Sequence, residues 1–274
     1  MVRIGWRLNL TRLAKHYWGK QIRQIGNIRS FQLLPTFLFS TLLSISHALA
    51  QNQPVDPVKV GTIIHNPPYV FENPTAGIDV DIIREAFGHA GMEVEIVHAH
   101  LSRIGVLLDA ERIDAMTAYR SRSDQCELSE PYGYWHNSII VRAGLTQEIK
   151  SFDDLAGLKV GLFPQAKTFF GLDLVRASAS FGNETTVFTT PSALRMLSYD
   201  RLDAYVGDSW GLDYLFHQNS EEETVTPYRV AHAFEPTARH LCFTDGDLRI
   251  AFNKGLSALQ ESGKIAEITR RYRN

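Results

Sequence analysis

The sequence predicts an α/β fold made of two related units, each with a largely parallel sheet. Two short patterns occur twice in the same order: VKVG at 58–61 is echoed by LKVG at 158–161, and LLDAERIDA at 107–115 by MLSYDRLDA at 196–204. In each unit strand-like and helix-like segments alternate, which is typical of parallel strands joined by right-handed crossovers. Chance similarity of such short words is the alternative, and their matching order argues against it.

The first unit is expected to contain three strands and two helices. In chain order these are VKVGTII (58–64), GIDVDIIREAFGHAG (77–91), MEVEIVHA (92–99), LSRIGVLLDAER (101–112) and IDAMTAY (113–119). In the first helix Asp79 or Asp81 can act as the N-cap, and Gly91 suits the C-terminal stop. The strand at 92–99 alternates apolar and polar residues, as a half-buried strand does.

The second unit repeats this plan. Its expected elements are a strand within SFDDLAGLKVGLF (151–163), a helix near 167–181, the strand ETTVFTT (184–190), the helix PSALRMLSYD (191–200) and the strand LDAYVGD (202–208). The last stretch, residues 247–274, has the periodicity of an amphipathic helix pair. Its expected core stripe consists of Leu248, Ala251, Phe252, Leu256 and Leu259.

The first fifty residues differ from the rest. Residues 1–30 carry seven Lys and Arg and no acid, and the uncharged run FQLLPTFLFSTLLSISHALA ends in Ala48-Leu49-Ala50. A basic region, an apolar core and small residues two apart predict a secretory signal peptide over residues 1–50, cleaved after Ala50. The proline and serines in the run make it a poor permanent span. An uncleaved anchor and a start further into the chain are the alternatives.

Removing residues 1–50 leaves 21 basic against 30 acidic residues, a net charge of about −9. This charge disfavours nucleic acid and anionic membrane surfaces as partners. Cys126 and Cys242 are the two cysteines of the sequence, and in an exported protein they permit one disulfide. His98 and His100 can face one way on a strand, but no third ligand is evident, so we expect no metal and no cofactor.

An acid ends the strand of the stretch RLDAYVGD. Asp208 lies five residues past Asp203, as Tyr119 lies five past Asp114, so the repeat makes Asp208 and Tyr119 equivalent strand ends. Ligands of parallel sheets sit beyond the carboxyl ends of the strands. Two facing units would place these residues on opposite walls of one cleft, and a helix N-cap is the alternative role for Asp208.

The chain resembles the family 3 extracellular solute-binding proteins, the periplasmic receptors of polar amino-acid ABC importers. The resemblance covers about 57–274 and is carried by PPYVF (67–71), GIDVDIIREAF (77–87), SEPYGYW (129–135), SFDDLAGLKVGLF (151–163), RLDAYVGD (201–208) and AFNKGLSALQESGKIAEI (251–268). It implies the two-lobed periplasmic-binding-protein (Venus-flytrap, type II) fold with two hinge strands. Lobe one would comprise 57–141 plus 238–274, and lobe two 142–237.

The resemblance also implies the ligand-binding residues. In the family an arginine seven residues before the SxPY serine grips the solute carboxylate, and counting back from Ser129 gives Arg122, although Arg120 can also serve. Asp208 falls where the family pairs an acid with the solute ammonium, and Tyr69 where an aromatic ring commonly covers the solute. The alternatives are a solvated turn arginine, a helix cap and a core aromatic.

The pocket departs from the family pattern in several places. Tyr119 stands where the family has a threonine, and the interval leading to Arg122 is shorter than usual. The Gly-Ser/Thr turn usual in lobe two is replaced by FPQAKT at 163–168, where Lys167 or Thr168 can substitute. These departures place an ordinary α-amino acid ligand in question.

A disulfide is a further implication of the resemblance. In the family's lobe-one sheet the strand before SxPY lies beside the strand that re-enters from lobe two, and Cys126 and Cys242 fall on those segments.

The leading functional hypothesis is a monomeric, non-enzymatic periplasmic receptor. It would bind a small polar, amino-acid-like solute and deliver it to an inner-membrane ABC permease. The alternatives are a periplasmic enzyme on the same scaffold, of the cyclic-carboxylate dehydratase type, and a soluble sensory protein that reports to a membrane partner.

The signal peptide gives the first test. We expect mature protein in a periplasmic fraction to begin at Gln51, as measured by N-terminal sequencing. Purified membrane-bound protein that retains residues 1–50 would exclude cleavage.

Overall fold

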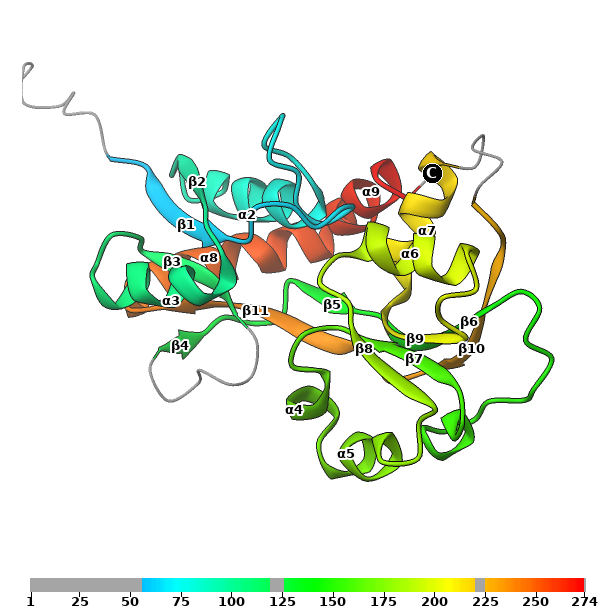
Figure 1. Cartoon of the computed structure of the whole chain (residues 1–274). Helices are drawn as coiled ribbons and strands as arrows, with labels where there is room; N and C mark the ends of the chain where they lie inside the picture. The colour runs from blue at the N-terminus through cyan, green and yellow to red at the C-terminus, as the bar shows by residue number, and fades with distance from the viewer. Residues whose placement is uncertain (1–55, 119–125, 220–224, 274) are drawn as a thin grey trace, which may run out of the picture. The chain divides into compact units, whose positions relative to one another are not determined.

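The computed structural model describes residues 56–118, 126–219 and 225–273 (Figure 1). These residues form two mixed sheets covered by helices, which confirms the predicted α/β class. We call the elements packed around the first sheet lobe one and those around the second sheet lobe two. Among the described residues, no helix has both the length and the apolar character needed to cross a membrane.

The first sheet has the strand order β2-β1-β3-β11-β4, with β5 also paired to β11. Strand β1 is parallel to β2 and β3, whereas β11 is antiparallel to its neighbours. The strands are β1 (Val58–Thr62), β2 (Val94–His98), β3 (Ala115–Ala118), β4 (Glu127–Leu128), β5 (Gly133–Trp135) and β11 (Thr237–Phe243). The helices are α2 (Ile78–Gly88), α3 (Leu101–Asp109), α8 (Gly246–Glu261) and α9 (Lys264–Arg271).

The second sheet has the order β10-β6-β9-β7-β8. Its strands are β6 (Asn137–Arg142), β7 (Lys159–Leu162), β8 (Asn183–Thr186), β9 (Ala204–Asp208) and β10 (Tyr228–Ala233). Its helical elements are the 3₁₀ turn η2 (Asp153–Leu155), α4 (Ala166–Phe170), α5 (Leu172–Ser178), α6 (Thr190–Ser198) and α7 (Ser209–Gln218).

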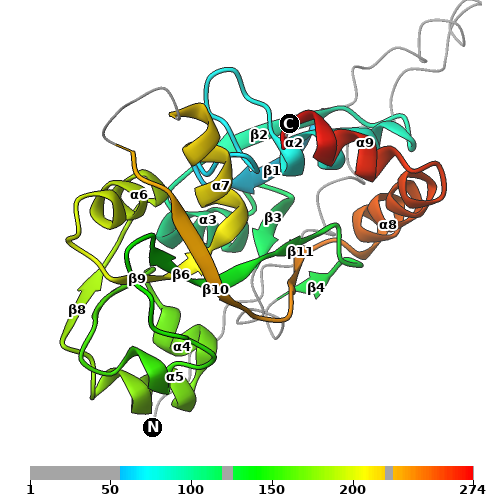
Figure 2. The same cartoon turned by 90° about the vertical axis from the view of Figure 1, so that its right-hand side faces the viewer.

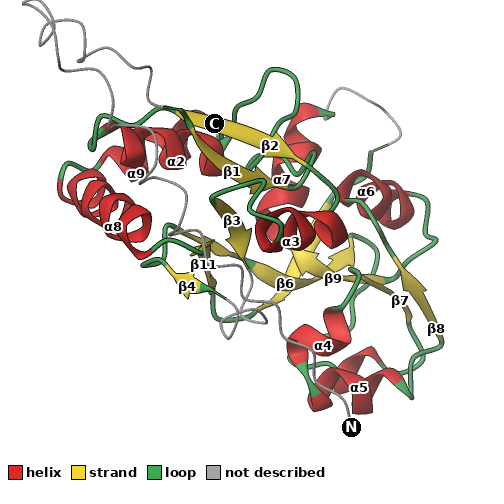
Figure 3. Cartoon of the chain, turned by 90° about the vertical axis from the view of Figure 1, so that its left-hand side faces the viewer, coloured by secondary structure: helices red, strands yellow, loops and turns green. Residues whose placement is uncertain are grey.

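Helices cover both faces of each sheet (Figure 3). In lobe one, a large apolar core joins the sheet to α2, α8 and α9, and a smaller one joins it to α3. In lobe two, one core joins the sheet to α4 and α5 and another joins it to α6 and α7. Burial on both faces explains why strands such as β6 and β9 carry continuous apolar runs.

The repeat seen in the sequence recurs in the structure. Val60 of β1 pairs with Ala115 of β3, and Val160 of β7 pairs with Ala204 of β9, in parallel register. The Asp114 carboxylate accepts a hydrogen bond from the Lys59 backbone N–H at 2.7 Å. The Asp203 carboxylate accepts the equivalent bond from Lys159 at 2.9 Å.

The two repeat glycines have one packing reason in common. A Cβ at Gly61 would collide with the side chain of Ile113, and one at Gly161 with that of Leu202. Each lobe therefore needs glycine at this position of its first strand. There the strand passes beneath an apolar side chain, Ile113 or Leu202, which comes shortly before the neighbouring parallel strand.

The chain crosses between the sheets twice. It leaves the first sheet after Trp135 and joins the second at Asn137, and it returns between Ala233 and Thr237. Figure 2 shows β10 and β11 following one another across this second crossing. The lobe limits at 142 and 237 remain predictions, although the sheet pairing favours an earlier first crossing.

Two local predictions were wrong. The helix expected near 167–181 is interrupted between α4 and α5 at Gly171, whose φ of 70° a continuous helix cannot contain. Neither Asp79 nor Asp81 caps α2, because the N-cap residue is Gly77 and it makes no side-chain cap bond. Both carboxylates instead reach other parts of the chain.

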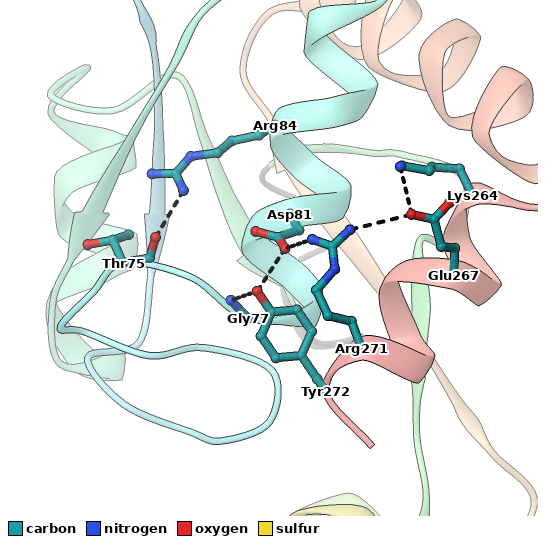
Figure 4. A network of polar contacts seen from close by, with 8 residues as sticks. All are labelled: Thr75, Gly77, Asp81, Arg84, Lys264, Glu267, Arg271 and Tyr272. Carbon is teal, nitrogen blue, oxygen red and sulfur yellow. Dashed lines mark hydrogen bonds and ion pairs between the residues drawn. The ribbon is translucent and has the colours of Figure 1, made fainter. Parts of the chain in front are cut away.

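Asp81 holds the C-terminal helix against α2 (Figure 4). Its Oδ2 accepts hydrogen bonds from the Tyr272 hydroxyl at 2.7 Å and from Arg271 Nη1 at 3.1 Å. The Tyr272 hydroxyl in turn accepts a bond from the Gly77 backbone N–H at 3.2 Å. The end of the chain is thereby tied to the first turn of α2.

Cys126 and Cys242 are joined in a disulfide, with Cα atoms 5.5 Å apart and 116 residues between them in sequence. Cys242 pairs with Leu128 across the β11–β4 ladder, which brings the two cysteines to neighbouring segments. The bond therefore closes a loop that includes all of lobe two.

A loop of this length predicts a large effect on stability. The double variant Cys126→Ala/Cys242→Ala should lower the free energy of unfolding by ~4 kcal/mol, because its unfolded chain is no longer constrained. Denaturant titration of the variant and of the oxidised protein measures the difference. Two thiols that titrate in the denatured, unreduced protein would contradict the bond.

Candidate solute site at the lobe junction

Asp208 ends β9 and begins α7 with a carboxylate that has three donors from the protein. Its Oδ2 accepts a hydrogen bond from the Gly211 backbone N–H at 2.7 Å and caps α7. Its Oδ1 accepts bonds from the Tyr69 hydroxyl at 3.0 Å and from the His136 backbone N–H at 3.2 Å. The carboxylate therefore joins lobe one, the first crossing and the N-terminus of α7.

The local chain brings these groups close together. A Cβ at Gly211 would lie 2.9 Å from Asp208 Oδ2 and 3.3 Å from the Pro67 carbonyl oxygen, so the absence of a side chain lets the lobe-one loop approach α7. Burial raises the pKa of the Asp208 carboxyl, and the bonds from Gly211, Tyr69 and His136 oppose that rise.

Tyr69 is fully buried, with 0% of its surface exposed. Its ring meets the Trp135 ring edge-on at 4.7 Å and the Arg239 guanidinium at 4.2 Å. Burial, followed by the charge of Asp208, raises the pKa of the Tyr69 phenol well above its ordinary value. The hydroxyl is therefore a stable donor to Asp208, and the role of this ring as a cover over the solute remains a prediction.

A buried ion pair that the sequence analysis missed lies beneath Tyr69. Arg239 Nη1 lies 2.6 Å from Asp79 Oδ1 and 2.8 Å from Oδ2, which also accepts a bond from the Tyr132 hydroxyl at 3.2 Å. The guanidinium lies over the rings of Tyr132 at 5.5 Å and Trp135 at 4.7 Å. Although burial opposes its charge, the nearby Asp79 raises the pKa of Arg239, so it stays a cation.

A small cavity opens beside this pair, at the ends of β1 and β3. Its volume is about 20 Å³. The lining residues are Thr62, Ile63, Asn66, Tyr69, Val70, Asp79, Thr117, Tyr132, Trp135 and Arg239. The one signal of this site in the sequence is Arg239 itself, which stands beside His240 in the polar first half of the strand TARHLCF.

Of the other predicted ligand residues, the structure describes Thr168. Tyr119, Arg120 and Arg122 lie outside the described residues, so their roles remain predictions. Thr168 is exposed on α4, and the neighbouring Lys167 pairs with Glu184 at 2.8 Å. The part of the chain that the structure describes contains no group of three or more His, Cys, Asp or Glu able to hold a metal ion.

A three-layer stack spans the first crossing. The His136 ring lies flat on the Trp210 ring at 3.7 Å, and the Arg273 guanidinium covers Trp210 at 3.9 Å. Burial, followed by the charges of Arg273 and Arg239, lowers the pKa of His136 to about 4. The ring is therefore neutral near pH 7.

Comparisons with known proteins agree on one family. The profile of the family described as bacterial extracellular solute-binding proteins, family 3, matches residues 58–274. A probable amino-acid ABC transporter-binding protein of Haemophilus influenzae is 26% identical over 239 residues, which cover 84% of this chain and 90% of that protein. The L-cystine-binding protein TcyJ of Escherichia coli K12 is 23% identical over 220 residues, covering 75% and 78%.

The fold has close structural relatives. An ancestral arginine-binding protein, solved with arginine bound, superposes with a TM-score of 0.66 at 24% identity. The match covers 81% of this chain and all of that chain. At this identity the likeness establishes the two-lobed fold and leaves the solute open.

His136 gives a pH prediction. An unfolded histidine takes up its proton near pH 6.5, whereas the folded His136 does so near pH 4, so stability should rise with pH between these values and be lost as pH falls. His136→Phe keeps an aromatic ring against Trp210 and removes the titrating nitrogens. Thermal unfolding from pH 4 to pH 7 should show a smaller rise in the variant, and equal slopes would contradict the assignment.

Proposed function

Because the chain belongs to family 3 of the bacterial extracellular solute-binding proteins, we propose that it binds a small polar, amino-acid-like solute between its lobes and delivers it to an ABC importer. The named relatives, an amino-acid ABC transporter-binding protein and an L-cystine-binding protein, support this class of solute. They are binding proteins, which supports a receptor rather than an enzyme.

The observation that carries the proposal is the charge balance at the lobe junction among the described residues. There Asp79 and Asp208 supply two carboxylates, and Arg239 supplies a guanidinium, which is paired with Asp79. Buried charges are stable only when they are paired or well hydrogen-bonded, so an ammonium group of the solute is the natural partner for Asp208.

Asp208 also has an acceptor position left for such a partner. An ionised carboxylate offers about four acceptor positions, and the donors among the described residues use two on Oδ1 and one on Oδ2. The cap role and the ligand role are therefore compatible. A solute that touches Asp208 and the other lobe stabilises the closed arrangement over the open one.

The proposed location is the periplasm, after removal of residues 1–50. The extracellular family and the transporter-binding relatives support this location. The proposed partners are the solute and an inner-membrane permease, with the receptor acting as a monomer.

Two variants separate the ligand role of Asp208 from its structural role. Asp208→Asn should weaken a cationic or zwitterionic solute by roughly 30-fold or more, because the solute ammonium loses its charged partner. Tyr69→Phe removes one donor to the same carboxylate and should leave affinity within a few-fold. Thermal-shift screening of amino acids, amines and small carboxylates identifies a ligand, and calorimetric titration then compares the variants.

Stability supplies the control. Both variants remove a hydrogen bond of Asp208, so both should lower the melting temperature of the unliganded protein. A lowered melting temperature with unchanged affinity in Asp208→Asn would leave this residue as a helix cap. The same titration of Arg122→Ala and Arg120→Ala identifies which arginine holds an anionic group.

A further inference from the structure

Two buried polar atoms that line the same small cavity have no hydrogen-bond partner in the described chain. They are Thr62 Oγ1, at the end of β1, and Arg239 Nε, on β11. Only 2% of Thr62 and 3% of Arg239 is exposed. An unsatisfied buried polar group is destabilising, so two of them on residues that line one cavity indicate a bound partner.

The chemistry of the two atoms defines that partner. Arg239 Nε carries one N–H and can only donate, whereas the Thr62 hydroxyl can donate or accept. The partner must therefore accept a hydrogen bond from Arg239. An oxygen atom that accepts from Nε and exchanges a second bond with Thr62 satisfies both.

The local charge indicates that this oxygen is neutral. The Arg239 charge is already balanced by Asp79, whose carboxylate lies 2.6 Å away. Asp208 adds a further negative charge close enough to contribute to the raised pKa of Arg239. Among the described residues, a second anion in the cavity would face the carboxylates of Asp79 and Asp208 and the guanidinium of Arg239, so an anion is disfavoured.

The size of the cavity limits how large the bound group can be. About 20 Å³ is enough for one water-sized group and too little for a larger moiety. Asn66 and Thr117 also line the cavity and offer polar atoms to such a group.

We propose that this cavity is a subsite for one neutral oxygen, held by Arg239 Nε and Thr62 Oγ1. The oxygen belongs either to an ordered water or to a hydroxyl, carbonyl or amide group of the bound solute. The solute alternative rests on the proposed function. A solute oxygen that displaces a water must reproduce its hydrogen bonds, so the subsite would favour an uncharged polar group over a carboxylate or an alkyl chain.

The first test is a variant of the same shape without the hydroxyl. If an oxygen is bound, Thr62→Val removes one of its partners and should lower the melting temperature by roughly 2–4 °C. If the cavity holds nothing, the same change removes an unsatisfied hydroxyl and should raise the melting temperature, which would overturn the proposal. Thr185→Val is the matched control, because it removes a hydroxyl from a half-buried strand position in lobe two.

Crystallography distinguishes the two sources of the oxygen. Density for an isolated oxygen within hydrogen-bond distance of both atoms, in ligand-free crystals, identifies a water. An oxygen of L-glutamine in that position, in crystals grown with L-glutamine, identifies the solute. Density for neither, or a carboxylate or chloride bound there, would overturn the proposal.

The experiments can contradict the proposed function and this inference independently of one another. Calorimetric titrations that remain silent for all amino acids would argue against an amino-acid receptor, while an ordered water in the ligand-free crystal would still support the subsite. L-glutamine and L-glutamate provide a matched pair if binding is found, because they differ in one neutral or charged terminal group. Tighter binding of L-glutamate in wild-type protein, with its side-chain carboxylate in the cavity, would contradict a neutral subsite.

Discussion

The ion pair between Asp79 and Arg239 is the constraint around which lobe one is organised. Asp79 lies in the first turn of α2, Arg239 lies on β11, and the rings around them come from Tyr69, Tyr132 and Trp135. Three segments far apart in sequence, 69–79, 132–135 and β11, therefore meet at one guanidinium. Gly133 of β5 belongs to this arrangement, because a Cβ there would collide with Arg239. Removing one partner of such a pair leaves a buried charge, which costs about 3–5 kcal/mol.

The pair also bears on the proposed binding of a solute. Because Asp79 pairs with Arg239, the proposal assigns the solute cation to Asp208. Tyr69 connects the ion pair to Asp208, since its ring lies on Arg239 and its hydroxyl donates to Asp208. A change in the charge of Arg239 or of Asp208 is therefore expected to affect the other group through the side chain of Tyr69.

Much of the fold could be predicted from the sequence, because local patterns carry it. The repeated words predicted two units of one plan, and the structure pairs Val60 with Ala115 and Val160 with Ala204 in equivalent registers. The Asp79–Arg239 pair could not be predicted, since its members are 160 residues apart and Asp79 has the position of an ordinary helix cap. The break at Gly171 was missed because glycine is tolerated within a helical pattern.

The contacts across the lobe junction bear on how tightly any solute is held. Three contacts join lobe one and the first crossing to α7: the Tyr69–Asp208 bond, the His136–Trp210–Arg273 stack and the edge contact of Phe71 with Tyr214 at 5.7 Å. Such contacts favour the arrangement described here, and an ammonium that approaches Asp208 would use the acceptor position that the protein donors leave on Oδ2. The net affinity is then the difference between the bonds that the solute makes and the bonds to water that it gives up. On this view, Tyr69 and α7 influence how strongly the receptor binds even where they do not touch the solute.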